Sequence, residues 1–314
     1  MAPPALRLRG VRKAYGRRVA LDGLDLTVPA GALCGLIGPN GAGKTTAFGI
    51  IGGVVRPDAG EVDLLGEGPF TPVRHRGRVT LLPQDAALPA AVPLRSMMRF
   101  YAQLQGMTAG AATRAADAVL DEVGLADRAG SRVDQLSHGM KRRAAVAQAL
   151  LGAPALVLLD EPTAGLDPDL VVRMRNLLRS RRGSTTLVVS SHVLLELEAI
   201  CDHVVFLESG RCVREGPLLE IAGAARVLRV VFSAPVAPEA AARAFPGRAA
   251  SGEGTCWSVP LHPGESAPAG LRSVLEAAWA IGLEPTEVRS GEGLEAAWLA
   301  GRISGSPPLM SRGP

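Results

Sequence analysis

The residues with the clearest capacity for chemistry form a glycine-rich run directly after an apolar segment, residues 33–37. This run is Gly38-Pro39-Asn40-Gly41-Ala42-Gly43-Lys44-Thr45 and fits the pattern G-x-x-x-x-G-K-[ST]. Glycines let backbone N–H groups curl around a polyanionic triphosphate without Cβ clashes, and a helix beginning here adds positive potential. Lys44 supplies a point charge for the β- and γ-phosphates, and Thr45 offers a hydroxyl to Mg²⁺. The run therefore predicts a nucleoside triphosphate site rather than a glycine-rich turn with a stray lysine.

An acidic pair follows a second apolar run. Asp160 and Glu161 come directly after residues 155–159. Asp160 can hold Mg²⁺, usually through water, and Glu161 can orient and deprotonate an attacking water. Strand ends are often polar, so the pair alone is weak evidence. Together with the phosphate loop it predicts hydrolysis of the nucleotide.

Both groups are carried by predicted strands of a parallel sheet. Residues 33–37, 155–159 and 186–190 are continuously apolar or β-branched, as expected for strands buried on both faces. Residues 46–51 are predicted to form a helix after the loop, and residues 21–28 a strand of a small antiparallel layer. Asp167 and Pro168 predict a capped helix start.

Composition excludes several classes of protein. The chain has 314 residues, 47% hydrophobic and 20% charged, which rules out a peptide, a disulfide miniprotein and a wholly disordered chain. A net charge of +4 is too small to indicate nucleic acid by itself. No apolar run approaches the ~20 residues that span a bilayer, and residues 1–10 lack a secretory signal pattern, so we expect a cytosolic protein. The four separated cysteines are expected to be reduced thiols.

The chain is expected to divide near Ala222. Residues 1–222 carry the motifs and are predicted to form the nucleotide-binding domain. Residues 223–303 show a weaker alternation of strands and helices that predicts a small α+β accessory domain. Residues 304–314 have little to bury and are predicted to be a disordered tail.

A short segment ahead of the acidic pair carries a family resemblance. Leu136-Ser137-His138-Gly139-Met140 resembles the signature of ABC transporter ATPases, and the resemblance covers about residues 5–220. It implies a P-loop NTPase core of the α/β class, with a mainly parallel sheet, a small antiparallel β layer and a helical signature subdomain. It also implies that Ser137 and Gly139 contact a γ-phosphate held by a partner chain, so that two chains pack head to tail around two ATP molecules.

The resemblance extends to further positions. It implies that Tyr15 stacks on adenine, that Gln84 senses Mg²⁺ and contacts the membrane subunit, that Asp167 lies in the D-loop, and that His192 contacts the γ-phosphate. Each has an ordinary alternative: a core aromatic, a loop amide, a helix cap and a core histidine. The expected nucleotide contacts are Tyr15, Gly38, Pro39, Asn40, Gly41, Ala42, Gly43, Lys44, Thr45, Thr46, Ser137, Gly139 and Asp167. The expected catalytic residues are Glu161, His192, Gln84 and Lys44, and the expected Mg²⁺ ligands are Thr45, Gln84 and Asp160.

The signature departs from the usual family pattern at two positions. His138 stands where glycine is common, and Met140 where glutamine is common. The His138 side chain is expected to face solvent. Three features resemble the ABC-2-type exporters: the methionine at position 140, residues 191–198 and the segment 293–299.

These features predict the ATP-hydrolysing subunit of a membrane exporter. The expected partners are a second ATPase subunit, either a copy of this chain or a related chain, and a separate permease at the cytoplasmic face of the membrane. The permease is expected to dock on the helical segment that contains Met97, Met98, Phe100 and Tyr101, since these cannot all face the core.

The alternative function is that of a non-transport ABC ATPase acting on nucleic acid, ribosomes or a protein assembly. No nucleic acid is expected, because aromatics are only 4% of residues and basic residues 74–78, 141–143 and 179–182 are interpreted as solvated faces. A regulator without catalysis is disfavoured, because Lys44, Asp160, Glu161 and His192 are all present.

Overall fold

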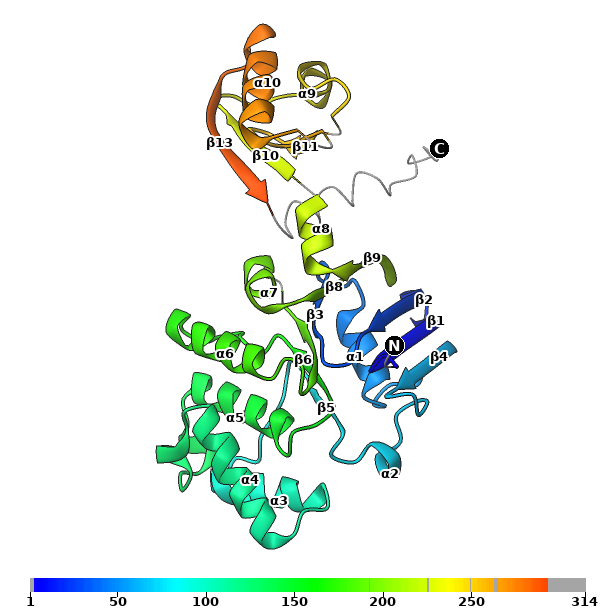
Figure 1. Ribbon diagram of the computed structural model, residues 1–314, viewed down its shortest axis with the longest axis vertical. Helices are drawn as coiled ribbons and strands as arrows, with labels where there is room; N and C mark the ends of the chain where they lie inside the picture. The colour runs from blue at the N-terminus through cyan, green and yellow to red at the C-terminus, as the bar shows by residue number, and fades with distance from the viewer. Residues whose placement is uncertain (1–2, 192, 225, 249, 263–264, 293–314) are drawn as a thin grey trace. The chain divides into compact units, whose positions relative to one another are not determined.

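The computed structural model describes residues 3–191, 193–224, 226–248, 250–262 and 265–292 (Figure 1). The chain forms two compact units, one ending at Glu215 and the other beginning at Gly216. The predicted boundary near Ala222 falls inside helix α8 (Leu218–Ala224). This helix belongs to the second unit.

The first unit alternates strands with helices. In chain order its elements are β1 (Leu6–Tyr15), β2 (Arg18–Val28), β3 (Leu33–Ile37), α1 (Lys44–Ile51), β4 (Ala59–Leu64), α2 (Pro72–His75), β5 (Val79–Leu82), α3 (Leu94–Leu104), α4 (Ala109–Glu122), the 3-10 turns Ala126–Arg128 and Val133–Gln135, α5 (His138–Leu150), β6 (Leu156–Asp160), α6 (Pro168–Ser180), β7 (Thr186–Ser190), α7 (Leu194–Ile200) and β8 (His203–Glu208). Strand β9 (Arg211–Pro217) spans the division between the units.

The main sheet has six strands in the order β5-β6-β7-β3-β8-β9. Strand β3 pairs in parallel with β7 and β8, and β6 pairs in parallel with β5 and β7. All residues of β3, β6 and β7 are buried, which explains their continuous apolar runs. The predicted strands 33–37 and 186–190 are confirmed, and the third begins at Leu156 and includes Asp160. Parallel pairing brings the carboxyl ends of these strands to one edge of the sheet, where ligands of open α/β sheets bind.

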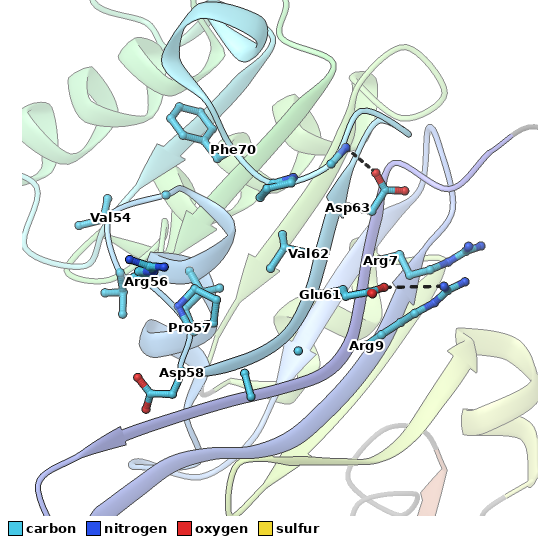
Figure 2. A pocket seen from close by; sticks show the side chains of 17 residues that line it. Arg7, Arg9, Val54, Arg56, Pro57, Asp58, Glu61, Val62, Asp63 and Phe70 are labelled. Carbon is cyan, nitrogen blue, oxygen red and sulfur yellow. Dashed lines mark hydrogen bonds and ion pairs between the residues drawn. The ribbon is translucent and has the colours of Figure 1, made fainter.

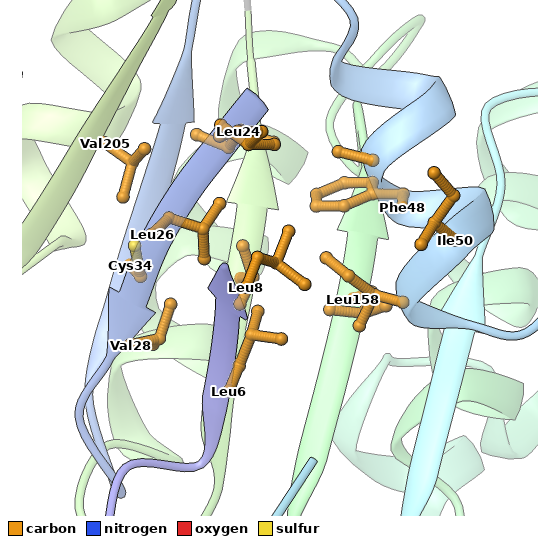
Figure 3. Close-up of a cluster of buried hydrophobic side chains, with 14 of the residues drawn as sticks. Leu6, Leu8, Leu24, Leu26, Val28, Cys34, Phe48, Ile50, Leu158 and Val205 are labelled. Atoms are coloured by element: carbon orange, nitrogen blue, oxygen red, sulfur yellow. The ribbon is translucent and has the colours of Figure 1, made fainter. Parts of the chain in front are cut away.

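A three-stranded antiparallel sheet, β2-β1-β4, packs beside the main sheet. Leu6 pairs with Val28 on one side and with Leu64 on the other. Its apolar face joins α1 and the main sheet in one core, which includes Leu8, Leu26 and Phe48 (Figure 3). The predicted antiparallel layer is therefore confirmed.

Helices α3 and α4 pack together in the segment between β5 and α5. Met97 and Met98 are buried, whereas the Phe100 side chain is 56% exposed. The expectation that not all four large side chains of α3 face the core is thus confirmed.

No helix among the described residues is both long and apolar enough to cross a membrane.

Helix α6 begins as predicted at Pro168, with Asp167 at its N-cap position. The prediction that Asp167 caps this helix through its side chain is wrong, because that side chain accepts no capping hydrogen bond and the residue is exposed. Proline at the first helical position lacks an N–H and has its φ fixed near the helical value, so this end needs less capping.

The second unit contains an antiparallel sheet in the order β11-β12-β10-β13. Its elements are α8, β10 (Arg226–Phe232), α9 (Pro238–Ala244), β11 (Ser251–Glu253), β12 (Cys256–Pro260), α10 (Ala267–Ala280) and β13 (Pro285–Glu292). Val230, Trp257 and Val259 of the sheet share a core with Ala241 of α9 and Val274 of α10. The short β11 was not predicted, and the exporter-like segment 293–299 lies outside the described residues.

A bidentate ion pair joins two loops of this unit. The two Nη atoms of Arg248 each lie 2.8 Å from a carboxylate oxygen of Glu265, and Nη1 also donates to the Pro260 carbonyl. The His262 N–H donates to the same carboxylate at 2.8 Å. The Arg248 side chain, followed by the His262 N–H, lowers the pKa of Glu265 from 4.5 to about 2.

Glu265→Gln should destabilise the second unit near neutral pH by removing this charge-assisted pair. Because the folded-state pKa is depressed, the stabilisation is fully present above pH 4.5 and is lost as the pH falls towards about 2. Equilibrium unfolding from pH 7 to about pH 3 should show the parent and variant curves converging, with exposed Glu276→Gln as the control. A destabilisation that does not depend on pH would contradict the role of the charge.

Candidate functional site

The loop after β3 is shaped by glycines that no other residue could replace. A Cβ at Gly38 would lie 2.4 Å from the Leu207 carbonyl oxygen, and one at Gly43 would lie 2.6 Å from the Ala20 carbonyl oxygen. Gly43 also has φ of +108° and occupies the N-cap position of α1. The loop therefore delivers the N-terminus of α1 to the edge of the sheet, with its unpaired N–H groups and positive dipole end.

Lys44 folds over this loop. Its Nζ donates to the carbonyl oxygens of Gly38 at 2.7 Å and Pro39 at 3.2 Å, and the residue is 9% exposed. Burial lowers the pKa of Lys44, while the carboxylates of Glu161 and Asp160 act in the opposite direction. The ammonium is partly desolvated and is held over the loop by two backbone carbonyl oxygens.

Asp160 is held between two hydroxyl groups at the end of β6. Thr45 Oγ1 lies 2.9 Å from Asp160 Oδ2, and Ser190 Oγ donates to Asp160 Oδ1. Asp160 is 2% exposed. A hydroxyl and a carboxylate oxygen at the mouth of the phosphate loop are ligands that suit Mg²⁺. Ser190 was not predicted, although it ends the neighbouring strand in register with Asp160.

Glu161 has an uncommon backbone conformation. Its φ is +52°, a left-handed value that costs a non-glycine residue about 1–3 kcal/mol. Its N–H donates to Ser190 Oγ at 3.0 Å, and its carbonyl accepts from Arg142. This turn redirects the chain at the end of β6, and Glu161 lines the same cavity as Lys44.

A cavity of about 820 Å³ collects most of the predicted residues. Those that line it are Tyr15, Asn40, Gly41, Gly43, Lys44, Thr45, Thr46, Gln84, Asp160 and Glu161, joined by the unpredicted Arg18, Ala20 and Ala164. Tyr15 is 50% exposed, so the alternative that it is a core aromatic is wrong. An exposed ring at the rim of this cavity suits stacking on a base. Gly38, Pro39 and Ala42 belong to the loop but do not line the cavity.

A larger cavity, of about 920 Å³, lies elsewhere on the first unit (Figure 2). It is lined by Val54, Phe70, Arg9 and Glu61, the last two forming an exposed ion pair at 4.0 Å. It contains neither the phosphate loop nor the acidic pair. Chemistry rather than volume therefore identifies the nucleotide site.

Three predicted nucleotide contacts lie away from the Lys44 cavity. Ser137 is the N-cap of α5 and accepts from the Met140 N–H at 3.2 Å, while Gly139 and the exposed Asp167 line no part of that cavity. His138 is exposed, as predicted. His192 lies outside the described residues.

The interpretation of residues 141–143 as a solvated face is wrong. Arg142 is 8% exposed, and its guanidinium donates to the backbone carbonyls of Gln84, Asp160 and Glu161. Arg143 donates to the carbonyls of Val123 and Gly124. Consecutive helix positions point in different directions, so a run of basic residues on α5 cannot all face solvent.

Known proteins resemble this chain in sequence. The family model described as ABC transporter matches residues 21–164. The Nod factor export ATP-binding protein I of Burkholderia lata is 40% identical over 66% of this chain and 69% of its own length. The daunorubicin resistance ATP-binding protein DrrA3 of Streptomyces coeruleorubidus is 37% identical over 70% of this chain and 71% of its own length.

Solved structures agree with the sequence relatives. An ATP-binding subunit of an ABC transporter superposes with a TM-score of 0.63 at 27% identity, covering 70% of this chain and 92% of its own. A dimeric ATP-binding cassette in a post-hydrolysis state with ADP and Pi also gives 0.63, at 25% identity, over 68% of this chain and 98% of its own. Because the similarity extends over two thirds of the chain, and one cavity brings together residues of the phosphate loop and the acidic pair, this protein belongs to the ABC transporter family and is an ATP-binding, ATP-hydrolysing subunit of it.

Proposed function

We propose that this chain drives an exporter, acting with a separate permease at the cytoplasmic face of the membrane. Two copies would close head to tail around two ATP molecules. The observation that carries the dimer is the division of the site: Lys44 and Glu161 line one cavity, while Ser137, Gly139 and Asp167 of the same chain lie outside it. A second copy could supply those three groups to the exposed side of the nucleotide. The export function is supported by relatives named for Nod factor export and daunorubicin resistance.

Within one chain, each part of the cavity has a separate task. The loop N–H groups and Lys44 hold the phosphates, and Tyr15 stacks on the base. Mg²⁺ would be held by Thr45 and Asp160, with Gln84 on the same cavity, and would neutralise phosphate charge. Glu161 orients and deprotonates the attacking water from the end of β6.

The basic clusters support a partner other than nucleic acid. Within the described chain, Arg78 pairs with Glu67, Arg181 with Glu122 and Arg182 with Asp202. Arg142 and Arg143 are bound to backbone carbonyls. These five side chains are engaged within the chain itself, so they are less available to a phosphate backbone, whose neutralisation dominates nucleic-acid affinity.

The exposed part of α3 is the proposed permease contact. Phe100 and Leu104 are 56% and 54% exposed, and the Tyr101 ring lies 5.9 Å from the Phe100 ring. Aromatic side chains are favoured in the cores of interfaces. The segment between β5 and α3 contains Gln84, which lines the nucleotide cavity, so a change there could reach α3.

Glu161→Gln should bind ATP like the parent but lose about 10²- to 10⁴-fold in turnover, because the amide cannot accept the proton of water. The ATP-bound dimer should accumulate, which analytical ultracentrifugation with Mg-ATP can measure. Hydrolysis at the parental rate would show that the general base is another residue.

Lys44→Ala should weaken ATP binding by roughly 10- to 100-fold, the effect of losing a hydrogen bond between charged groups. Calorimetry gives the dissociation constant, and the unfolding midpoint checks that the loop still folds. An unchanged dissociation constant would place Lys44 away from the phosphates.

Phe100→Asp should release the protein from membranes that contain its permease while leaving ATP affinity unchanged. The matched control is Leu219→Asp, which places the same charge at a side chain 86% exposed on α8. Membrane sedimentation compares the two variants. If Phe100→Asp sediments and supports export like the parent, α3 is not the docking site.

A further inference from the structure

We infer that Arg142 is a positioning residue for ATP hydrolysis. It holds the loop after β5 that contains Gln84, called the Gln84 loop below, at a fixed distance from Glu161. The inference rests on the proposed role of Glu161 as general base. It concerns a residue that contributes no atom to the cavity containing Lys44.

The Arg142 guanidinium spans two separate segments of backbone. Nη1 donates to the Gln84 carbonyl at 3.1 Å, and Nη2 donates to the Asp160 carbonyl at 2.6 Å and the Glu161 carbonyl at 2.5 Å. All three acceptor residues also line the nucleotide cavity. One planar side chain thus fixes the distance between the loop after β5 and the end of β6.

The conformation of Glu161 explains why a fixed point is needed there. Its left-handed backbone persists only if neighbouring groups hold it in place. The Ser190 bond holds the peptide on its N–H side, and on its carbonyl side the Arg142 bond adds to one from the Ala164 N–H at 3.1 Å. If the Ser190 or the Arg142 bond were lost, the Glu161 carboxylate could relax away from the water that it must orient.

An arginine suits this position better than other donors. Its rigid fork presents several N–H groups in fixed directions, whereas a lysine ammonium is a point donor on a flexible stem. Burial lowers the pKa of Arg142, and the charges of Asp160, Glu161 and Asp85 oppose that effect. The cation is therefore held among the acids of the site.

The position of Arg142 on α5 also connects it with the signature. Ser137 caps the same helix, about one and a half turns before Arg142. A movement of the helix end that meets the partner's nucleotide would therefore reach the Gln84 loop and Glu161 of its own chain through this side chain.

The test compares Arg142→Met and Arg142→Lys with Arg143→Met in the 314-residue chain. Arg143 is the matched control, because it occupies the next position of α5 and its carbonyl acceptors, Val123 and Gly124, lie outside the site. Arg142→Met should lower kcat by roughly 10- to 100-fold, the effect of misplacing a catalytic group by about 1 Å. The dissociation constant for Mg-ATP should stay within about threefold of the parent, since the phosphate loop is untouched.

Arg142→Lys should recover part of kcat, because an ammonium can reach one backbone segment but cannot span both. Amide hydrogen exchange without nucleotide should be faster around Gln84 in the Arg142 variants, and Arg143→Met should keep the parental kcat per folded molecule. If Arg142→Met does not fold, Arg142→Lys decides by the same two constants.

Parental kcat in the Arg142 variants would overturn the inference, as would equal losses of kcat and ATP affinity. Glu161→Gln, measured alongside, separates the two hypotheses. If it is inactive while the Arg142 variants are active, the positioning role fails; if it is fully active, the proposed general base fails.

Discussion

The hydrogen-bonded position of Asp160 is the constraint on which the rest of the site depends. The carboxylate is buried and meets Thr45 from α1 and Ser190 from β7. A buried carboxylate without partners would be costly, so these bonds fix how β6, β7 and the phosphate loop end relative to one another. The same register brings Glu161 and Lys44 to one cavity, because the strands are parallel and end at one edge.

The fold therefore places the residues that hold the phosphates apart from the signature residues that would complete the ATP site. Close approaches at Gly38 and Gly43, together with the buried Lys44, form a phosphate cradle within a single chain. The signature residues belong to α5, whose N-cap lies apart from that cradle. In the proposed dimer, ATP would be the ligand that joins the two parts, and Arg142 would transmit the position of α5 to the catalytic acid.

Sequence reasoning found the residues whose chemistry is local and missed those whose role comes from tertiary contacts. Residues 38–45 carry their function in their own spacing, and the strand before them in its unbroken apolar run. Ser190 and Arg142 have no such local pattern: one acts through register with β6, and the other through the inward side of α5. Strand register could have indicated Ser190. The three consecutive basic residues 141–143 could not all face solvent on one helix, but the sequence did not indicate which of them would be buried.

The head-to-tail arrangement of two chains is the central claim, and complementation tests it most directly. In such a dimer each ATP site uses Lys44 of one chain and Ser137 of the other, so Lys44→Ala and Ser137→Arg chains should each be inactive alone. Mixing them creates dimers in which one of the two sites contains both intact groups. The account predicts that the mixture hydrolyses ATP, whereas a mixture no more active than its separate components would contradict it.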